Sequence, residues 1–63
     1  MKLRDYKAWI KRYGWVLEKG GFDWKVMDSS GKVIIKNIIV THPGREVTAF
    51  CVQKTDKIIK ALS

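Results

Sequence analysis

The hydrophobic residues at the start of the chain recur at steps of three and four positions, with charged residues between them. This spacing is typical of an amphipathic helix that buries one face. The apolar positions that define the pattern are Leu3, Tyr6, Trp9, Ile10 and Tyr13. Gly14 follows directly and is a common helix terminator. The pattern therefore predicts a helix over residues 3–13.

The pattern then changes to short β-prone stretches separated by turn residues. Residues 15–19 form the first stretch, and the glycine pair 20–21 provides a turn or bulge. A second strand over 22–27 places Phe22, Trp24 and Val26 on one face, because successive strand residues point to opposite sides. The turn sequence 28–31 leads to a third strand over 33–41, the most apolar part of the chain.

The C-terminal third fits two interpretations. Residues 46–52 have strand propensity, and we favour a fourth strand there, after a turn at residues 43–45. In this interpretation Thr55 caps a helix that runs to Leu62. The alternative is one long helix, because several apolar residues also fit a single helical face. These residues are Val47, Phe50, Cys51, Ile58 and Leu62.

Together these elements predict an α+β fold in a single small domain over residues 1–63, in the order α-β-β-β-(β)-α. Both helices are expected on one face of an antiparallel sheet, because a hairpin of this size is not stable alone. A chain of 63 residues has room for only one core. The candidate core residues are Trp9, Ile10, Trp24, Val26, Ile35, Ile39, Ile58 and Leu62.

The charge of the chain indicates the class of its partner. Thirteen Lys and Arg residues against six Asp and Glu residues give a net charge of +7, which favours a polyanion such as nucleic acid or an acidic protein. The cations expected to contact phosphates gather in the first and last helices. They are Lys2, Arg4, Lys7, Lys11, Arg12, Lys54, Lys57 and Lys60. The alternative is that these residues form ordinary solvated faces that keep the domain soluble.

Few residues offer catalytic chemistry. His42 is the one imidazole, at a strand end beside a turn, and we favour a structural role for it over a catalytic one. Cys51 is interpreted as a buried apolar residue. No metal or cofactor is expected, because neither metal-ligand spacing nor a glycine-rich phosphate loop occurs. A single cysteine, no signal peptide and no long apolar run predict a cytoplasmic protein without membrane contact.

Several short segments occur in an order that matches a known family. They are Gly14-Trp15-Val16-Leu17, Lys19-Gly20-Gly21, the turn at Gly31, His42-Pro43-Gly44-Arg45-Glu46-Val47, and the terminal Ile58-Ile59-Lys60-Ala61-Leu62. In this order the chain resembles the HicA (YcfA-like) toxins of toxin–antitoxin systems. The resemblance implies a fold like that of the double-stranded-RNA-binding domain, messenger RNA as the target, and a cognate antitoxin as a partner.

The resemblance breaks at the catalytic position. The family's catalytic histidine follows a glycine pair at the start of the second strand, where this chain has Phe22 and Asp23. His42 matches a different family histidine, at the end of the third strand. We therefore predict a small basic module that binds nucleic acid, RNA in preference to DNA, without nuclease activity. Two alternatives stay open: an effector that binds an acidic host or antitoxin protein through its basic surface or a sheet edge, and a residual ribonuclease that uses His42.

Overall fold

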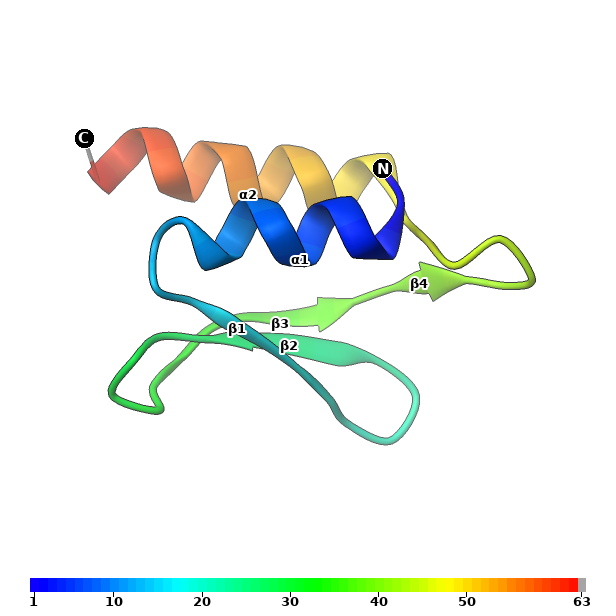
Figure 1. Cartoon of the computed structure of the whole chain (residues 1–63), viewed down its shortest axis with the longest axis horizontal. Helices are drawn as coiled ribbons and strands as arrows, with labels where there is room; N and C mark the ends of the chain where they lie inside the picture. The colour runs from blue at the N-terminus through cyan, green and yellow to red at the C-terminus, as the bar shows by residue number, and fades with distance from the viewer. Residues whose placement is uncertain (63) are drawn as a thin grey trace.

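Two helices lie on the same side of a three-stranded antiparallel sheet (Figure 1). The computed structural model describes residues 1–62. The elements are α1 (Leu3–Lys11), β1 (Val16–Lys19), β2 (Trp24–Met27), β3 (Val33–Ile38), β4 (Val40–Thr41), β5 (Glu46–Val47) and α2 (Ala49–Leu62). The predicted α+β fold, with both helices on one face of the sheet, is confirmed. Within the described residues no helix is long and apolar enough to span a membrane.

The sheet has the strand order β1-β2-β3, and its register aligns apolar residues across the strands. Leu17 lies opposite Val26, and Val26 lies opposite Ile35. The prediction of one strand over 33–41 is wrong, because the chain breaks between β3 and β4. Asn37 has a φ of 59°, in the left-handed region that asparagine tolerates better than most residues. Beyond this bend β4 pairs with β5 in a separate two-stranded sheet.

The β2–β3 turn is held by the carboxylate of Asp28. One of its oxygens accepts hydrogen bonds from the Ser30 hydroxyl at 2.6 Å, the Ser30 amide at 2.9 Å and the Lys32 amide at 3.0 Å. These bonds favour the ionised form, so they hold the pKa of Asp28 below its ordinary value. The expected turn over 28–31 is thus an Asx-type turn.

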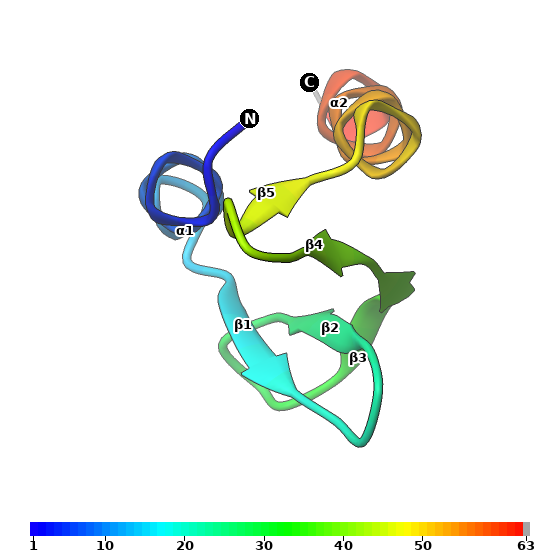
Figure 2. The ribbon, with the colours of Figure 1, turned by 90° about the vertical axis from the view of Figure 1, so that its right-hand side faces the viewer.

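The first residues of the chain pair with β5 and hold the β4–β5 turn against the start of α1 (Figure 2). Lys2 forms an antiparallel bridge with Glu46. The Leu3 amide donates to the Arg45 carbonyl at 2.9 Å, and the Val47 amide donates to the Met1 carbonyl at 2.8 Å. Residues 42–45 are therefore fixed beside α1 although they are distant in sequence.

The C-terminal helix is longer than the favoured interpretation predicted, and the alternative of one long helix is right from residue 49 onward. It begins at Ala49, so the strand interpretation is right for residues 46–47 and wrong for 49–52. Thr55 is not a helix cap; it is buried within α2. Its hydroxyl donates to the carbonyl of Cys51 at 2.8 Å and accepts a hydrogen bond from the Tyr6 hydroxyl at 2.7 Å. This second bond joins α1 to α2.

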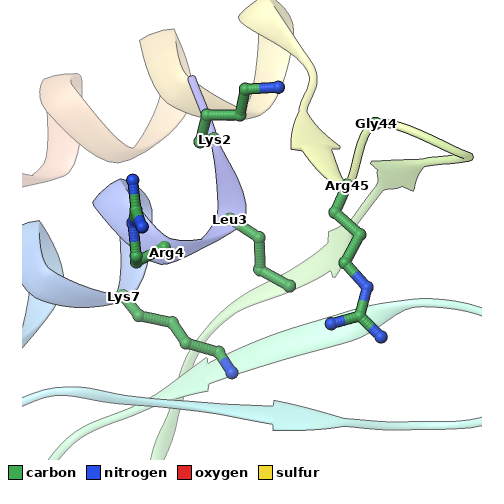
Figure 3. Close-up of a pocket in the computed structure, with 6 residues that line it drawn as sticks. All are labelled: Lys2, Leu3, Arg4, Lys7, Gly44 and Arg45. Carbon is green, nitrogen blue, oxygen red and sulfur yellow. The ribbon is translucent and has the colours of Figure 1, made fainter.

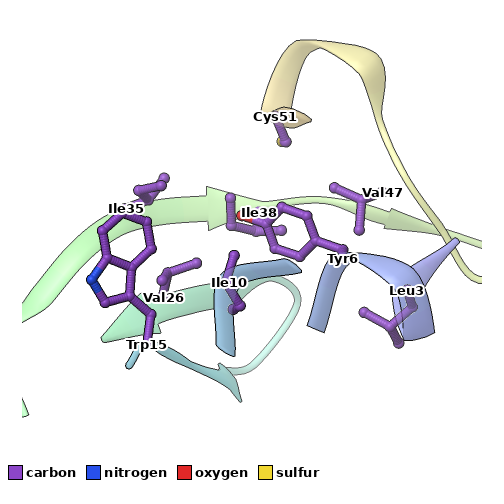
Figure 4. Close-up of a cluster of buried hydrophobic side chains, with 9 residues drawn as sticks. All are labelled: Leu3, Tyr6, Ile10, Trp15, Val26, Ile35, Ile38, Val47 and Cys51. Carbon is purple, nitrogen blue, oxygen red and sulfur yellow. The ribbon is translucent and has the colours of Figure 1, made fainter. Parts of the chain in front are cut away.

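The core lies between the helices and the sheet (Figure 4). Its buried members are Leu3, Tyr6, Ile10, Trp15, Val26, Ile35, Ile38, Val47 and Cys51. Burial of Cys51 confirms its interpretation as an apolar residue, and its thiol donates to the Asn37 carbonyl with an S···O distance of 3.7 Å. Three predicted core residues, Trp9, Trp24 and Ile58, are partly buried against the cluster.

Two of the predictions for the core are wrong. Ile39 is 53% exposed because it follows the bend at the end of β3, where the chain leaves the main sheet. Leu62 is 68% exposed because α2 extends beyond the end of α1, as Figure 1 shows. The helical periodicity of α2 therefore continues past the region that the core covers.

Candidate nucleic-acid interface

Two neighbouring grooves lie where the start of α1 meets the β1–β2 and β4–β5 turns. The first, which we call the helix groove, has a volume of about 430 Å³ and is lined by Lys2, Leu3, Arg4, Lys7, Gly44 and Arg45 (Figure 3). The second, the turn groove, has a volume of about 550 Å³ and is lined by Leu3, Lys7, Lys19, Gly21, Phe22, Trp24, Val40, His42 and Arg45. Because the grooves share Leu3, Lys7 and Arg45, they form one concave surface, the basic cleft.

The two shared cations come from distant parts of the chain. Lys7 projects from α1, and its Nζ lies 5.3 Å from the centre of the Trp24 ring, a cation–π contact that steadies the ammonium group. Arg45 precedes β5 and has a φ of 50°, which is costly for a residue with a side chain. Figure 3 shows both side chains extending toward the sheet on either side of Leu3. Both cations therefore line the same cleft.

The cleft is electrostatically one-sided. No acidic residue is among those that line either groove. Glu46 lies beside the cleft and pairs with Lys2, with a distance of 3.7 Å between Nζ and Oε1. Both side chains of this pair are half-exposed, so the pair contributes little to stability. It offsets the charge of Lys2 and leaves the positive field to Arg4, Lys7, Lys19 and Arg45.

The β1–β2 turn places an aromatic side chain at the cleft. The Gly20 amide donates to the Asp23 carbonyl at 2.8 Å, and a Cβ on Gly20 would lie only 3.0 Å from that oxygen. A side chain at this position would crowd the turn, which favours glycine. Phe22 follows the glycine pair, has a relative exposure of 107% and lies before β2, so its placement in a strand over 22–27 is wrong. The strand β2 begins only at Trp24.

The predicted cations do not form a single surface. Lys2, Arg4 and Lys7 line the cleft, whereas Lys11 and Arg12 lie at the C-terminal end of α1. The α2 cations line a separate groove of about 480 Å³, together with Phe50 and other residues. Its polar lining residues are Gln53, Lys54, Asp56, Lys57 and Lys60. In that groove the Asp56 carboxylate pairs with the Lys60 ammonium at 2.9 Å.

Sequence reasoning missed Lys19 and Arg45 as residues that line the basic cleft. Each lies beside a glycine in a turn, Lys19 before Gly20 and Arg45 after Gly44. A cation next to a glycine turn is a local signal that could have identified them, because such turns bring the backbone close to ligands.

His42, the weak catalytic candidate, is exposed and lines the turn groove with Lys7 and Arg45. The structure thus places the one imidazole among cations suited to a phosphate. Across residues 1–62 no group of three or more His, Cys, Asp or Glu side chains could hold a metal ion.

Comparisons of the chain with protein-family models, with curated proteins and with solved structures returned no match. The resemblance to the HicA toxins therefore stays a prediction from short motifs.

Proposed function

We propose that the protein is a small nucleic-acid-binding module that holds the phosphate backbone in its basic cleft. The observation that supports this most is the placement of Lys7 and Arg45, which line both grooves from opposite sides without an acidic residue among the lining. Arg4 extends the positive surface along α1, and Lys19 extends it to the sheet. RNA is the favoured nucleic acid, because the resemblance to the HicA toxins implies an RNA target.

The binding is dominated by electrostatics. Each phosphate that a Lys or Arg side chain neutralises releases condensed counterions, so the affinity falls log-linearly as the salt concentration rises. Contacts of this kind set the position of the backbone and carry no base sequence by themselves. The proposal therefore describes a module with broad sequence tolerance. An effector that binds one acidic protein would instead need that particular protein.

Cleavage is not part of the proposed function. Phe22 and Asp23 occupy the position at which the resemblance implies a catalytic histidine. A phenyl ring cannot accept a proton, and a carboxylate is a weaker general base than an imidazole at neutral pH. His42 is in the cleft and supports the alternative of a residual ribonuclease. RNA cleavage by the purified protein that disappears in His42→Ala would establish that alternative and overturn the binding-only proposal.

The first prediction tests whether the cations of the cleft contribute more to binding than the other cations of the chain do. We expect Lys7→Gln combined with Arg45→Gln to weaken binding of a labelled 20-nucleotide RNA by about tenfold or more, because charge-assisted contacts to phosphate are lost. The slope of log affinity against log salt should fall by roughly 1.4 to 1.8, since about two contacts are removed. Fluorescence anisotropy at several salt concentrations measures both quantities.

The matched control is Lys54→Gln combined with Lys57→Gln, which removes the same charge from α2. We expect this variant to retain most of the affinity. Equal losses in the two variants would show that net charge alone drives binding and that the cleft has no special role. Unchanged binding in the cleft variant would show that Lys7 and Arg45 form a solvated face.

A further inference from the structure

The turn groove combines a free aromatic ring with cations. Phe22 lines this groove and is fully exposed, so the fold gains nothing from burying its ring. Lys7, Lys19 and Arg45 line the same groove. A ring beside phosphate-binding cations is the combination by which proteins hold single-stranded nucleic acids, with bases stacked on the ring and phosphates on the cations.

Phe22 is the ring that is available for stacking. Trp24 also lines the groove, but it is half-buried and one face of its indole carries the Lys7 ammonium. Beside Phe22, a Cβ added to Gly21 would meet no atom within 4 Å, so the turn is open on this side. The tight turn closed by Gly20 and Asp23 fixes the backbone that carries the ring.

We propose that the turn groove binds a nucleotide of a single strand, with its base stacked on Phe22 and its phosphate held by Lys7 and Arg45. This inference rests on the proposed function and makes it more specific. A duplex cannot use the site fully, because its bases are stacked inside the helix and expose no face to a protein ring. The module therefore selects unpaired segments, and it does so without reading the base sequence, since every base has a stacking face.

The test distinguishes contacts to the base from contacts to the phosphate backbone. The probes are a single-stranded 12-nucleotide oligo-U, an abasic strand of the same length and charge, and a duplex of the same length. We expect Phe22→Ala to weaken oligo-U binding by about 5- to 150-fold, the range of one lost base–aromatic stack. Its binding to the abasic strand should not change. Phe22→Trp keeps a ring for stacking and should prefer oligo-U to the abasic strand, as the parent does.

The control variant is Phe50→Ala, because Phe50 is also an exposed phenylalanine, at 74%, but lines the separate groove on α2. We expect it to bind all three probes as the parent does. Thermal unfolding of each variant checks that the fold is unchanged, as both rings are outside the core.

The outcomes distinguish the two proposals. If the parent protein binds none of the probes, both the proposed function and this inference fail. If it binds oligo-U and the abasic strand equally and Phe22→Ala has no effect, the cleft contacts only the backbone and this inference alone is overturned. Tighter binding of the duplex than of oligo-U would also overturn it.

Discussion

The hydroxyl groups of Tyr6 and Thr55 form the polar centre of an otherwise apolar core. Both residues are fully buried, and a buried hydroxyl is costly unless it is hydrogen-bonded. The bonds run from Tyr6 to Thr55 and from Thr55 to the Cys51 carbonyl, so each hydroxyl proton has an acceptor. Among the described residues no buried side-chain nitrogen or oxygen lacks a partner. The pair fixes how α2 sits against α1.

This pair gives a pH-dependent prediction. Burial raises the pKa of the Tyr6 phenol above its ordinary value of 10.0. Above pH 10 the unfolded chain releases this proton while the folded protein still retains it. The free energy of unfolding therefore falls as the pH rises from about 10 through the folded pKa. We expect Tyr6→Phe to remove this part of the decline.

Urea denaturation of both proteins between pH 8 and pH 11 measures the effect. At neutral pH Tyr6→Phe should cost only about 1 kcal/mol, because Thr55 still donates to Cys51. Lysine titration affects both proteins alike. The difference between their two curves of unfolding free energy against pH therefore gives the contribution of the Tyr6 phenol. Curves that stay parallel above pH 10 would contradict the prediction.

At the scale of elements, the sequence predicted α1 and the three main strands because each has a local pattern. The three- and four-residue spacing of α1 and the turn residues around β2 are visible without knowledge of the fold. The start of α2 was left open, because the local pattern fits both a strand over 46–52 and one long helix. Val47, Thr48 and Val52 have strand propensity, but the helix is stabilised where Cys51 and Thr55 meet α1 and β3, and these contacts are long-range.

The candidate site was predictable to a similar extent. The excess of cations and their presence on both helices were evident from composition and spacing. The position of Arg45 beside the cations of α1 depends on the pairing of Lys2 with Glu46. No local pattern reports a contact between residues 1–3 and residues 45–47. The exposure of Phe22 was also missed, because alternation assigned it to a strand.

Two truncations test the difference between apolar periodicity in the sequence and burial of the side chain in the structure. Ile35→Ala, in the middle of β3, should lower the free energy of unfolding by about 2 to 5 kcal/mol, because Ile35 is fully buried. Leu62→Ala should change it by less than about 0.5 kcal/mol, since Leu62 is exposed at the end of α2. Chemical denaturation measures both values.

A conservative variant serves as the control for this comparison. Ile35→Val removes one methyl group and should cost only about 0.5 to 1.5 kcal/mol. A large loss in Leu62→Ala would mean that the end of α2 is covered in solution, in contrast to the structure.

At the scale of the whole molecule, the dominant property is a net charge of +7 on 63 residues. Such an excess of one sign opposes compaction through self-repulsion, even while it attracts polyanions. The ion pairs of Lys2 with Glu46 and Lys60 with Asp56 are exposed and offset little of this repulsion. Stability and binding therefore respond to salt in opposite directions.

We expect the Tm to rise by about 2 to 5 °C between 20 mM and 300 mM NaCl, because screening weakens the repulsion by a fraction of a kcal/mol. Over the same range the affinity for nucleic acid should fall. Calorimetry or thermal unfolding followed by circular dichroism measures the first effect. A Tm that falls with salt would show that attractive pairs outweigh the repulsion.

The common direction of the two helices has a consequence for how the protein meets a ligand. α1 and α2 run side by side and begin at the same end of the 33 Å molecule, the end that carries the β4–β5 turn (Figures 1 and 2). Each helix start carries about half a positive charge from its peptide dipoles, and parallel helices add these charges at one pole. A polyanion exerts a torque on such a dipole and turns this pole toward itself before contact. Under the proposed function, these dipoles favour the orientation that presents Arg45 and the start of α1 to a nucleic acid.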